Sequence, residues 1–348
     1  MESDSVLKLD YLSLDELADR PAAWWQNVLG VAAFDAAAPR ASSPEIPMAS
    51  VQTPVLGANP RRFEVWQAPR AARSGTLGRV RYRLGAGVVF GRLSIAESEL
   101  DAISGETTAL QRATELAYRE LFAVVDALAM PHLVRVWNFL PDINGSSHGS
   151  ERYWQFNSAR QDGFIACARA VTGAVPAACG VGSPRGAPLI IYFLASATAP
   201  TVIENPRQVS AYNYPAAYSP RSPTFSRACV VDFPNGRMLF ISGTASILGH
   251  ATVHVGDAVA QTRETLRNIE ALLGAANSGA GARAPFAMSD LCFKAYVRHA
   301  ADHALIEGEL RAALGAGAQA LYLNAELCRQ DLLVEIEATG CRFATGRA

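Results

Sequence analysis

Residues 321–340, LYLNAELCRQDLLVEIEATG, alternate between apolar and polar side chains in two runs. The apolar positions of the first run are Leu321, Leu323, Ala325 and Leu327. A period of two is typical of strands with one buried face, so the stretch predicts two strands joined by a short turn. The second strand carries Glu335 and Glu337 opposite Val334 and Ile336. Either one glutamate faces a cleft, or both are solvated on an open sheet face.

The composition is typical of a globular protein. A length of 348 residues exceeds one typical core, so two domains are the default expectation. Hydrophobic residues make up 50% of the chain and charged ones 18%, which is enough to bury a core. The net charge of -1 gives no electrostatic reason to expect nucleic acid or a membrane as partner. The longest apolar run, LIIYFLASA from Leu189, is strand-like and too short to span a bilayer.

The cysteines and the first residues bear on location. The six cysteines never approach the CxxC spacing, which fits reduced thiols better than a disulfide framework or a zinc site. The N-terminus, MESDSVLKLD, has no basic segment followed by an apolar run, so no secretory signal is visible. We therefore expect a cytoplasmic protein.

The same order of elements is expected twice along the chain. From Val80 it comprises strands, a helix over about 107–128, a strand from His132, a helix over 151–171 and further strands. The second copy begins with a hairpin that turns at Asn235-Gly236. Helices over about 255–273 and 304–314 and the two strands of the opening stretch follow. This predicts an α+β chain of two tandem units, each a mixed β-sheet with helices packed on one face.

Four segments follow from this repeat. Residues 1–75 are expected to be a lead-in that packs on the first domain, with residues 10–29 helical and residues 36–60 mostly loop. Residues 76–200 form the N-terminal domain, residues 201–227 a connecting loop that contributes to the site, and residues 228–348 the C-terminal domain that carries Glu335.

Several local motifs are set aside. The glycines between Gly180 and Gly186 lead into a strand, so they offer no helix N-terminus to a nucleotide. The histidine pairs, His250 with His254 and His299 with His303, have neither an HExxH glutamate nor a nearby third ligand. No GxSxG motif proposes a serine nucleophile. We expect no metal site and no cofactor.

Arginine and tyrosine are concentrated in two segments. The helix over 151–171 carries Arg152, Tyr153 and Arg160, and the connecting loop carries Arg207, Tyr212, Tyr214, Tyr218, Arg221 and Arg227. A guanidinium group binds a carboxylate through two parallel hydrogen bonds, so a small dianion is the favoured ligand. The alternative is that these arginines lie on a solvated helix and loop.

The segments LLVEIEA, ISGTASI and FKAYVR resemble the YjgF/RidA superfamily, whose members form trimers with clefts at subunit boundaries. Residues 60–345, with ERYWQFNSAR, ENPRQVSAYNYP, YSPRSPTFSRA and CRQDLLVEIEA, resemble the chorismatases. The resemblance implies two tandem RidA/YjgF-like units, in which the N-terminal unit stands where a neighbouring subunit would be. The imine deaminases of the superfamily carry an arginine at the position of Ala320, which argues against deaminase activity.

The chorismatase resemblance implies a cofactor-independent enzyme that cleaves chorismate and releases pyruvate. It places the proton donor at Glu335 and an assisting group at Cys328. Together with Gly243, Cys328 resembles the group that forms 3-hydroxybenzoate, whereas diol-forming members carry alanine at the glycine position. The expected substrate-binding residues are Arg152, Tyr153, Arg160, Tyr212, Arg221 and Gly243.

Four other functions stay open from the sequence: a bifunctional enzyme giving both 3- and 4-hydroxybenzoate, a chorismate hydrolase giving a dihydrodiol, an imine deaminase and a non-catalytic ligand-binding protein. The expected partner is a small molecule, chorismate, with no nucleic acid and no membrane. The chain is expected to be a monomer or a homo-oligomer such as a trimer.

Overall fold

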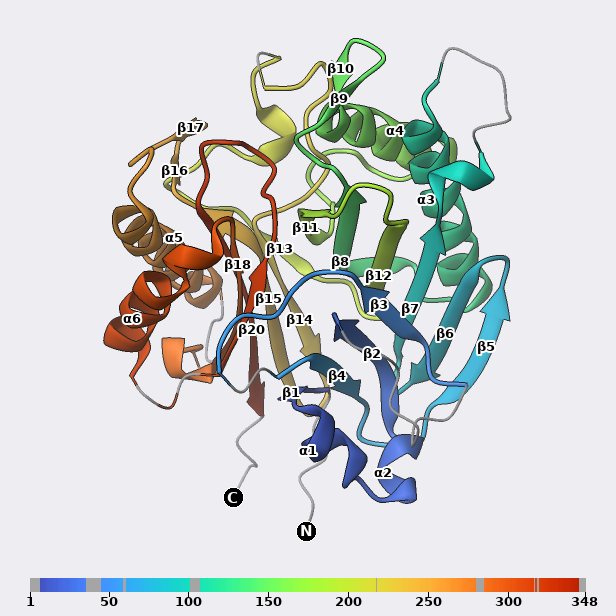
Figure 1. Cartoon of the computed structure of the whole chain (residues 1–348). Helices are drawn as coiled ribbons and strands as arrows, with labels where there is room; N and C mark the ends of the chain where they lie inside the picture. Colours follow the sequence, from blue (N-terminus) through green and yellow to red (C-terminus); the bar gives the residue numbers. More distant parts are fainter. Residues whose placement is uncertain are drawn as a thin grey trace.

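The computed structural model describes residues 7–35, 45–58, 61–100, 107–216, 218–279, 285–315, 317 and 319–343. Within these ranges, three larger β-sheets surround one shared apolar core and carry helices on their outer faces (Figure 1). Two small ribbons complete the strands, β9 (Ser146–Ser147) with β10 (Ser150–Glu151) and β16 (Ile247–Leu248) with β17 (Ala251–Thr252).

The first unit is a six-stranded sheet in the order β11-β8-β12-β7-β6-β5, covered by two helices. Its strands are β5 (Arg73–Leu77), β6 (Val80–Gly85), β7 (Val88–Ile95), β8 (His132–Pro141), β11 (Ala177–Ser183) and β12 (Leu189–Ser196). Its helices are α3 (Ala109–Ala127) and α4 (Arg152–Ala166). Helix α3 begins after Thr108, whose hydroxyl accepts the amide of Gln111, and the Gln111 side chain caps Thr108 in return.

The second unit is a six-stranded sheet in the order β13-β14-β15-β20-β18-β19. Its strands are β13 (Thr201–Ile203), β14 (Ala228–Phe233), β15 (Gly236–Ala245), β18 (Leu291–Val297), β19 (Ala320–Asn324) and β20 (Val334–Phe343). The helices α5 (Ala258–Ser278) and α6 (His303–Leu314) cover one face of this sheet (Figure 1).

The two sheets match strand for strand when one order is reversed. In this comparison β5 corresponds to β13, β6 to β14, β7 to β15, β12 to β20, β8 to β18 and β11 to β19. In each sheet only the last two strands of this series are parallel, and all other pairs are antiparallel. The prediction of an α+β chain of two tandem units, each a mixed sheet with helices on one face, is confirmed.

The opening stretch differs from its prediction in one respect. Its two strands, β19 and β20, are not joined by a short turn, because β18 lies between them and residues 325–333 cross over it. Ala325 and Leu327, expected within the first strand, are buried in this connection. The strand ends at Asn324, whose side-chain amide donates to the carbonyls of Val297 and Arg298.

The lead-in forms a sheet of its own, which corrects the prediction of a helix and a long loop. Its strands pair in the order β1-β4-β2-β3, and the outer face is covered by two short helices. These elements are β1 (Lys8–Leu12), α1 (Leu14–Ala18), α2 (Ala22–Gln26), β2 (Val28–Phe34), β3 (Met48–Val51) and β4 (Phe63–Gln67). Every residue of β2 is buried, so its sequence shows no period of two that could have revealed it.

The lead-in also contacts both units rather than the first alone. The amide of Leu56 donates to the carbonyl of Tyr322 on β19, and the amide of Asn324 donates to the carbonyl of Pro54. Residues 36–44 and 59–60 of the expected loop lie outside the described residues. Strand β13 belongs to the second sheet although it was expected in the connecting loop. The other domain boundaries stay predictions.

The inner faces of the three sheets meet in the shared core. Phe34 of the lead-in, Tyr192 of the first unit and Phe240 of the second all belong to it. On β20, Val334, Ile336 and Ala338 pack toward the helices of the second unit, so Glu335 and Glu337 project into the inner layer. Their exposed fractions are 4% and 5%, which excludes two solvated glutamates.

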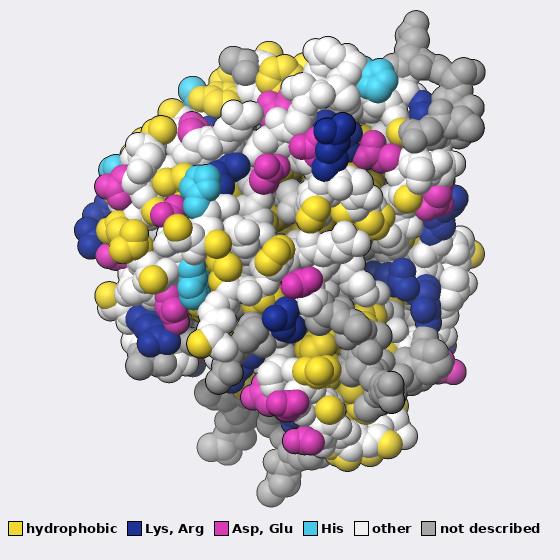
Figure 2. Space-filling model, viewed as in Figure 1, with side chains coloured by type: hydrophobic (Ala, Val, Ile, Leu, Met, Phe, Trp, Pro, Cys, Tyr) yellow, Lys and Arg dark blue, Asp and Glu magenta, His cyan; other side chains and the backbone are white. Residues whose placement is uncertain are grey.

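The face shown in Figure 2 carries basic and acidic side chains intermixed rather than in a patch of one sign. Among the described residues, no helix is both long and apolar enough to cross a membrane. No cluster of three or more metal-ligating side chains occurs in the described ranges. All six cysteines are free thiols.

Candidate active site

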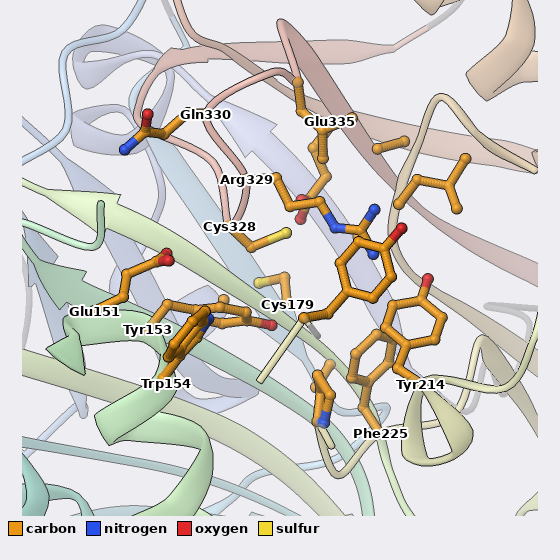
Figure 3. A pocket seen from close by; sticks show the side chains of 18 of the residues that line it. Glu151, Tyr153, Trp154, Cys179, Tyr214, Phe225, Cys328, Arg329, Gln330 and Glu335 are labelled. Atoms are coloured by element: carbon orange, nitrogen blue, oxygen red, sulfur yellow. The ribbon is translucent and has the colours of Figure 1, made fainter. Parts of the chain in front are cut away.

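A cavity of about 290 Å³ lies between the two units, and both contribute to its wall. This volume is near the lower end of the range for small-molecule sites. The wall includes Tyr153 and Arg160 of α4, Cys179 of β11, Tyr214 and Arg227 of the connecting loop, Gly243 of β15, Cys328 of the crossover segment and Glu335 of β20. Figure 3 shows Tyr153 and Trp154 on one side of the cavity and Tyr214 and Phe225 on the other.

Glu335 points from β20 into this cavity (Figure 3). Its burial and the charge of Glu337 raise the pKa of its carboxyl group to about 8, while Arg135 and Arg227 partly oppose the increase. Burial disfavours the charged form of a carboxylic acid, and a second carboxylate nearby disfavours it further. Glu335 is therefore protonated at neutral pH and can act as a general acid.

Gly243 makes room for this carboxyl group. The pairing of β15 with β20 shifts its register between Ile241 and Thr244, so Ser242 and Gly243 form a bulge beside Glu335. A Cβ atom on Gly243 would lie 1.9 Å from Oε1 of Glu335 and 3.2 Å from Cβ of Cys179. Only glycine fits this position while Glu335 keeps its orientation.

Glu337, two residues further along the same strand, has the opposite character. It accepts hydrogen bonds from Trp137 Nε1 at 2.7 Å and from the Tyr296 hydroxyl at 3.1 Å, and it pairs with Lys294 and Arg135. Burial alone would raise the pKa of Glu337, but Lys294 and Arg135 hold it below its ordinary value. The two carboxyl groups of one motif thus have pKa values that are pushed apart, which is typical of acid-base sites.

Two cysteines lie in the wall near Glu335. Burial and the adjacent Glu335 raise the pKa of the Cys328 thiol to about 12, and burial raises the pKa of Cys179 as well. Both side chains are therefore neutral thiols at neutral pH rather than thiolates. A neutral thiol is a weak hydrogen-bond partner, so neither cysteine is suited to be a strong base.

Three arginines line the cavity and keep donors free. Arg160 and Arg227 are 3% and 4% exposed, and Arg329 is partly buried. Within the described residues, Nε of Arg160, Nε of Arg227 and Nη2 of Arg329 are buried without a hydrogen-bond partner. A buried donor without a partner is costly, so these groups are suited to bind the oxygens of an anionic ligand.

Arg329 also ties the rim of the cavity together. Its guanidinium group lies over the ring of Tyr218, 4.1 Å from the centroid, and over Tyr214 at 5.2 Å. Its Nη1 donates to the carbonyl of His250 at 2.9 Å. The connecting loop, the β16–β17 ribbon and the crossover segment therefore meet around one side chain.

The comparisons with known proteins agree on one family. A 3-hydroxybenzoate synthase of Streptomyces hygroscopicus is 41% identical over 233 residues, which cover 65% of this chain and 68% of the relative. A chorismatase of Streptomyces rapamycinicus is 36% identical over 79% of this chain and 80% of its own length. The chain belongs to the chorismatase family. The family model described as chorismatase FkbO/Hyg5-like, N-terminal, matches residues 64–195 of this chorismatase.

The similarity extends to the whole fold of the chorismatase. A chorismatase crystal structure at 29% identity superimposes with a TM-score of 0.83 over 97% of this chain and 98% of the other. Both units and the lead-in sheet are therefore part of the shared architecture.

In this chorismatase, the structure brings five of the residues expected from the sequence to one cavity. They are Tyr153, Arg160, Gly243, Cys328 and Glu335. Their sequence separation spans almost two hundred residues, which shows that the cavity requires both units.

The other three expected residues do not line the cavity of the chorismatase. Arg152 donates to the carbonyl of Pro141 and pairs with Glu97 in a separate surface hollow. Arg221 pairs with Asp162, and Tyr212 lies in a short helical turn outside the wall. Arg152 and Arg160 lie eight residues apart on α4, and such positions differ by about 80° around a helix, so the two side chains point in different directions.

The expected set lacked several residues that line the chorismatase site, among them Tyr214, Tyr218, Arg227 and Arg329. The sequence did show Tyr214, Tyr218 and Arg227 within the arginine- and tyrosine-rich loop, but it offered no way to rank them. Arg329 directly follows Cys328, and that adjacency was the available signal.

Proposed function

We propose that this chorismatase cleaves chorismate to 3-hydroxybenzoate and pyruvate without a cofactor. The observation that carries the proposal is a buried carboxylic acid with a pKa of about 8, facing a cavity that three arginines line. Chorismate is a dicarboxylate with an enolpyruvyl ether, so it requires both cationic groups and a proton donor. The name of the 41% identical relative, 3-hydroxybenzoate synthase, supports the product.

The first step is proton transfer from Glu335 to the methylene carbon of the enolpyruvyl group. The proton adds to carbon and leaves an oxocarbenium ion at the ether carbon, while Glu335 becomes a carboxylate. Arg135 and Arg227 are the cations that oppose the raised pKa of Glu335, so they stabilise this negative charge.

The second step is internal displacement. The C4 hydroxyl group of the ring attacks C3, the C3–O bond breaks, and pyruvate leaves with the ether oxygen. The resulting arene oxide opens and aromatises to 3-hydroxybenzoate. The two products together contain the atoms of chorismate, so neither water nor a redox cofactor enters the balance.

Cys328 steers the C4 hydroxyl group rather than deprotonating it. The pKa of its thiol is raised to about 12, so a thiolate is scarce near neutral pH. The acceptor for the hydroxyl proton is then the Glu335 carboxylate left by the first step, which restores the acid for the next cycle.

The other product outcomes are weaker proposals. The dihydrodiol requires water at the oxocarbenium ion, and the glycine and cysteine at positions 243 and 328 match the hydroxybenzoate-forming pattern instead. A mixture of 3- and 4-hydroxybenzoate stays an alternative to the single product. Ala320 stands where imine deaminases carry an arginine, which disfavours that reaction.

The test is incubation of the purified protein with chorismate in buffer treated with a chelator, followed by chromatography and mass analysis of the acids. We expect 3-hydroxybenzoate and pyruvate in equal amounts. In D₂O, the pyruvate methyl group should carry one deuterium, which reports protonation of the methylene carbon. Absence of chorismate consumption would refute the proposed function, and diol formation would refute the product.

Two further expectations stay proposals. A cytoplasmic location is supported by the free thiols. The oligomeric state, monomer or homo-oligomer, can be measured by sedimentation.

A further inference from the structure

A chain of four buried charges lies next to the cavity and reaches the lead-in sheet. Lys294 Nζ lies 2.5 Å from Glu64 Oε2 and 2.8 Å from Glu337 Oε1, and Arg135 Nη2 lies 2.5 Å from Glu337 Oε2. The four side chains are at most 7% exposed. Two acids and two bases give a net charge of zero.

The lead-in residue Glu64 is held firmly within this chain. Its Oε1 accepts from Trp66 Nε1 at 2.8 Å, and its Oε2 accepts from Lys294. The three donors of Lys294 are all used, by Glu64, Glu337 and the Tyr192 hydroxyl at 3.1 Å. The orientation of Lys294 toward Glu337 therefore depends on Glu64.

The chain of charges lies close to Glu335. Glu337 and Glu335 are two residues apart on one strand and project to the same face, a separation of about 7 Å along the backbone. Buried charges at such distances interact far more strongly than they would in water. The net charge of the cluster therefore affects the protonation of Glu335.

We propose that Glu64 is a positioning residue whose negative charge, acting through Lys294 and Glu337, keeps Glu335 protonated in the resting enzyme. The proposal rests on the proposed function of Glu335 as the acid. With Glu64, the cluster is neutral and offers Glu335 no net attraction for a negative charge. Without Glu64, the cluster carries one positive charge and favours the carboxylate of Glu335.

Several other titratable groups face Glu335, but they do not substitute for the charge of Glu64. They are Tyr153 of α4, Cys179 of β11, Tyr296 of β18, Cys328 of the crossover segment and Arg227 before β14. Burial raises the pKa of the four tyrosine and cysteine neighbours Tyr153, Cys179, Tyr296 and Cys328, so they stay neutral at neutral pH. The charged neighbours are Arg227, Arg135 and Glu337, and the last two belong to the cluster.

The test uses two charge changes of opposite sign. Glu64→Gln keeps the side-chain volume and an acceptor for Trp66, and it makes the cluster positive. Lys294→Gln keeps a donor for Glu337 and makes the cluster negative. The double variant restores neutrality. Glu16→Gln on α1, an exposed glutamate of the same lead-in, serves as the control.

We expect the alkaline limb of the kcat/KM profile to move down by about one pH unit in Glu64→Gln and up by a similar amount in Lys294→Gln. The double variant should return toward the wild-type profile, and Glu16→Gln should match it. A purely structural role predicts lower Tm values and a uniform loss of activity without displacement of the limb. That result, or equal displacement in both single variants, would overturn the proposal.

A second measurement can be made on variants that have no measurable chorismate turnover. The Glu335 carboxyl band can be titrated by infrared difference spectroscopy, with Glu335→Gln as the subtracted reference. Opposite displacements of this titration in the two single variants support the proposal even if chorismate is not the substrate. An unmoved titration in the folded Glu64→Gln variant overturns it, while chorismate turnover separately tests the proposed function.

Discussion

A methyl group on Gly243 would lie 1.9 Å from Oε1 of Glu335. The carboxyl group of Glu335 would therefore have to move if residue 243 carried a side chain. Gly243 and Glu335 are therefore coupled: the glycine sets the position of the acid, although it offers no functional group itself.

Gly243→Ala should displace the Glu335 carboxyl group and shift the product toward the dihydrodiol, because the diol-forming members that this chain resembles carry alanine at this position. The matched control is Gly274→Ala on α5, where an added Cβ meets no atom within 4 Å. We expect the control to retain wild-type activity. An active Gly243→Ala variant with unchanged products would contradict the coupling.

The pH dependence of the reaction follows from the raised pKa of Glu335. The active form is protonated, so kcat/KM should be level below a pH of about 8 and fall as the pH rises through that value. Steady-state kinetics between pH 5 and about 10 measure the limb, where the loss approaches about tenfold per pH unit. Glu335→Gln should abolish turnover, and retention of most turnover would refute the assigned acid.

The raised pKa of Glu335 should also make the stability of the folded chain depend on pH. The unfolded chain releases the Glu335 proton near 4.5, whereas the folded chain keeps it until about 8, so folding becomes less favourable as pH rises across that interval. Glu335→Gln removes this loss. In urea unfolding, the wild type and Glu335→Gln should have the same free energy of unfolding near pH 4. At pH 8 the free energy of unfolding of Glu335→Gln should be higher by about 3 to 5 kcal/mol. A difference that does not grow with pH would argue against a protonated glutamate.

Cys328→Ala should shift the product toward the dihydrodiol, because the C4 hydroxyl group loses its steering contact and water competes for the oxocarbenium ion. Cys167→Ala at the end of α4 is the control, since this cysteine does not line the cavity. The ratio of diol to 3-hydroxybenzoate, measured by chromatography, checks the prediction. An unchanged ratio would remove the thiol from the mechanism.

Arg160→Met should lower kcat/KM by about 10- to 100-fold, chiefly through a higher KM, because a charged hydrogen bond to a carboxylate is lost. Arg221→Met, at a partly exposed pair with Asp162, should change it by less than about twofold. Equal effects at both positions would show that the cavity wall does not distinguish substrate-binding arginines from the others.

Periodicity and repeat were sufficient to predict the two units, because amphipathic helices and strands with one buried face leave a pattern in the sequence. Strand β2 of the lead-in left none, since it is buried on both faces. The sequence around Glu335 and Glu337 indicated an alternating strand. It did not indicate that the first unit covers the polar face of this strand. That covering depends on contacts between segments about 200 residues apart, such as Arg135 with Glu337.

The same distinction between local sequence pattern and long-range contact applies to the site residues. Glu335, Cys328 and Gly243 could be predicted because they belong to motifs that the chorismatase resemblance contains. The arginines could not be ranked, because whether Arg160 or Arg152 faces the cavity depends on the rotation of α4 against the sheet. Arg329 reaches the site through a crossover that no local pattern reveals.

The two walls of the cavity belong to one polypeptide, and this affects how the site can evolve. In a symmetric assembly of identical subunits, every substitution recurs on all copies of the surface, so a change that suits one wall also alters the other. Here the wall with Arg160 and the wall with Glu335 are encoded separately. Each can acquire substitutions without altering its counterpart, so a duplicated unit can give up its own acid and specialise in holding the substrate.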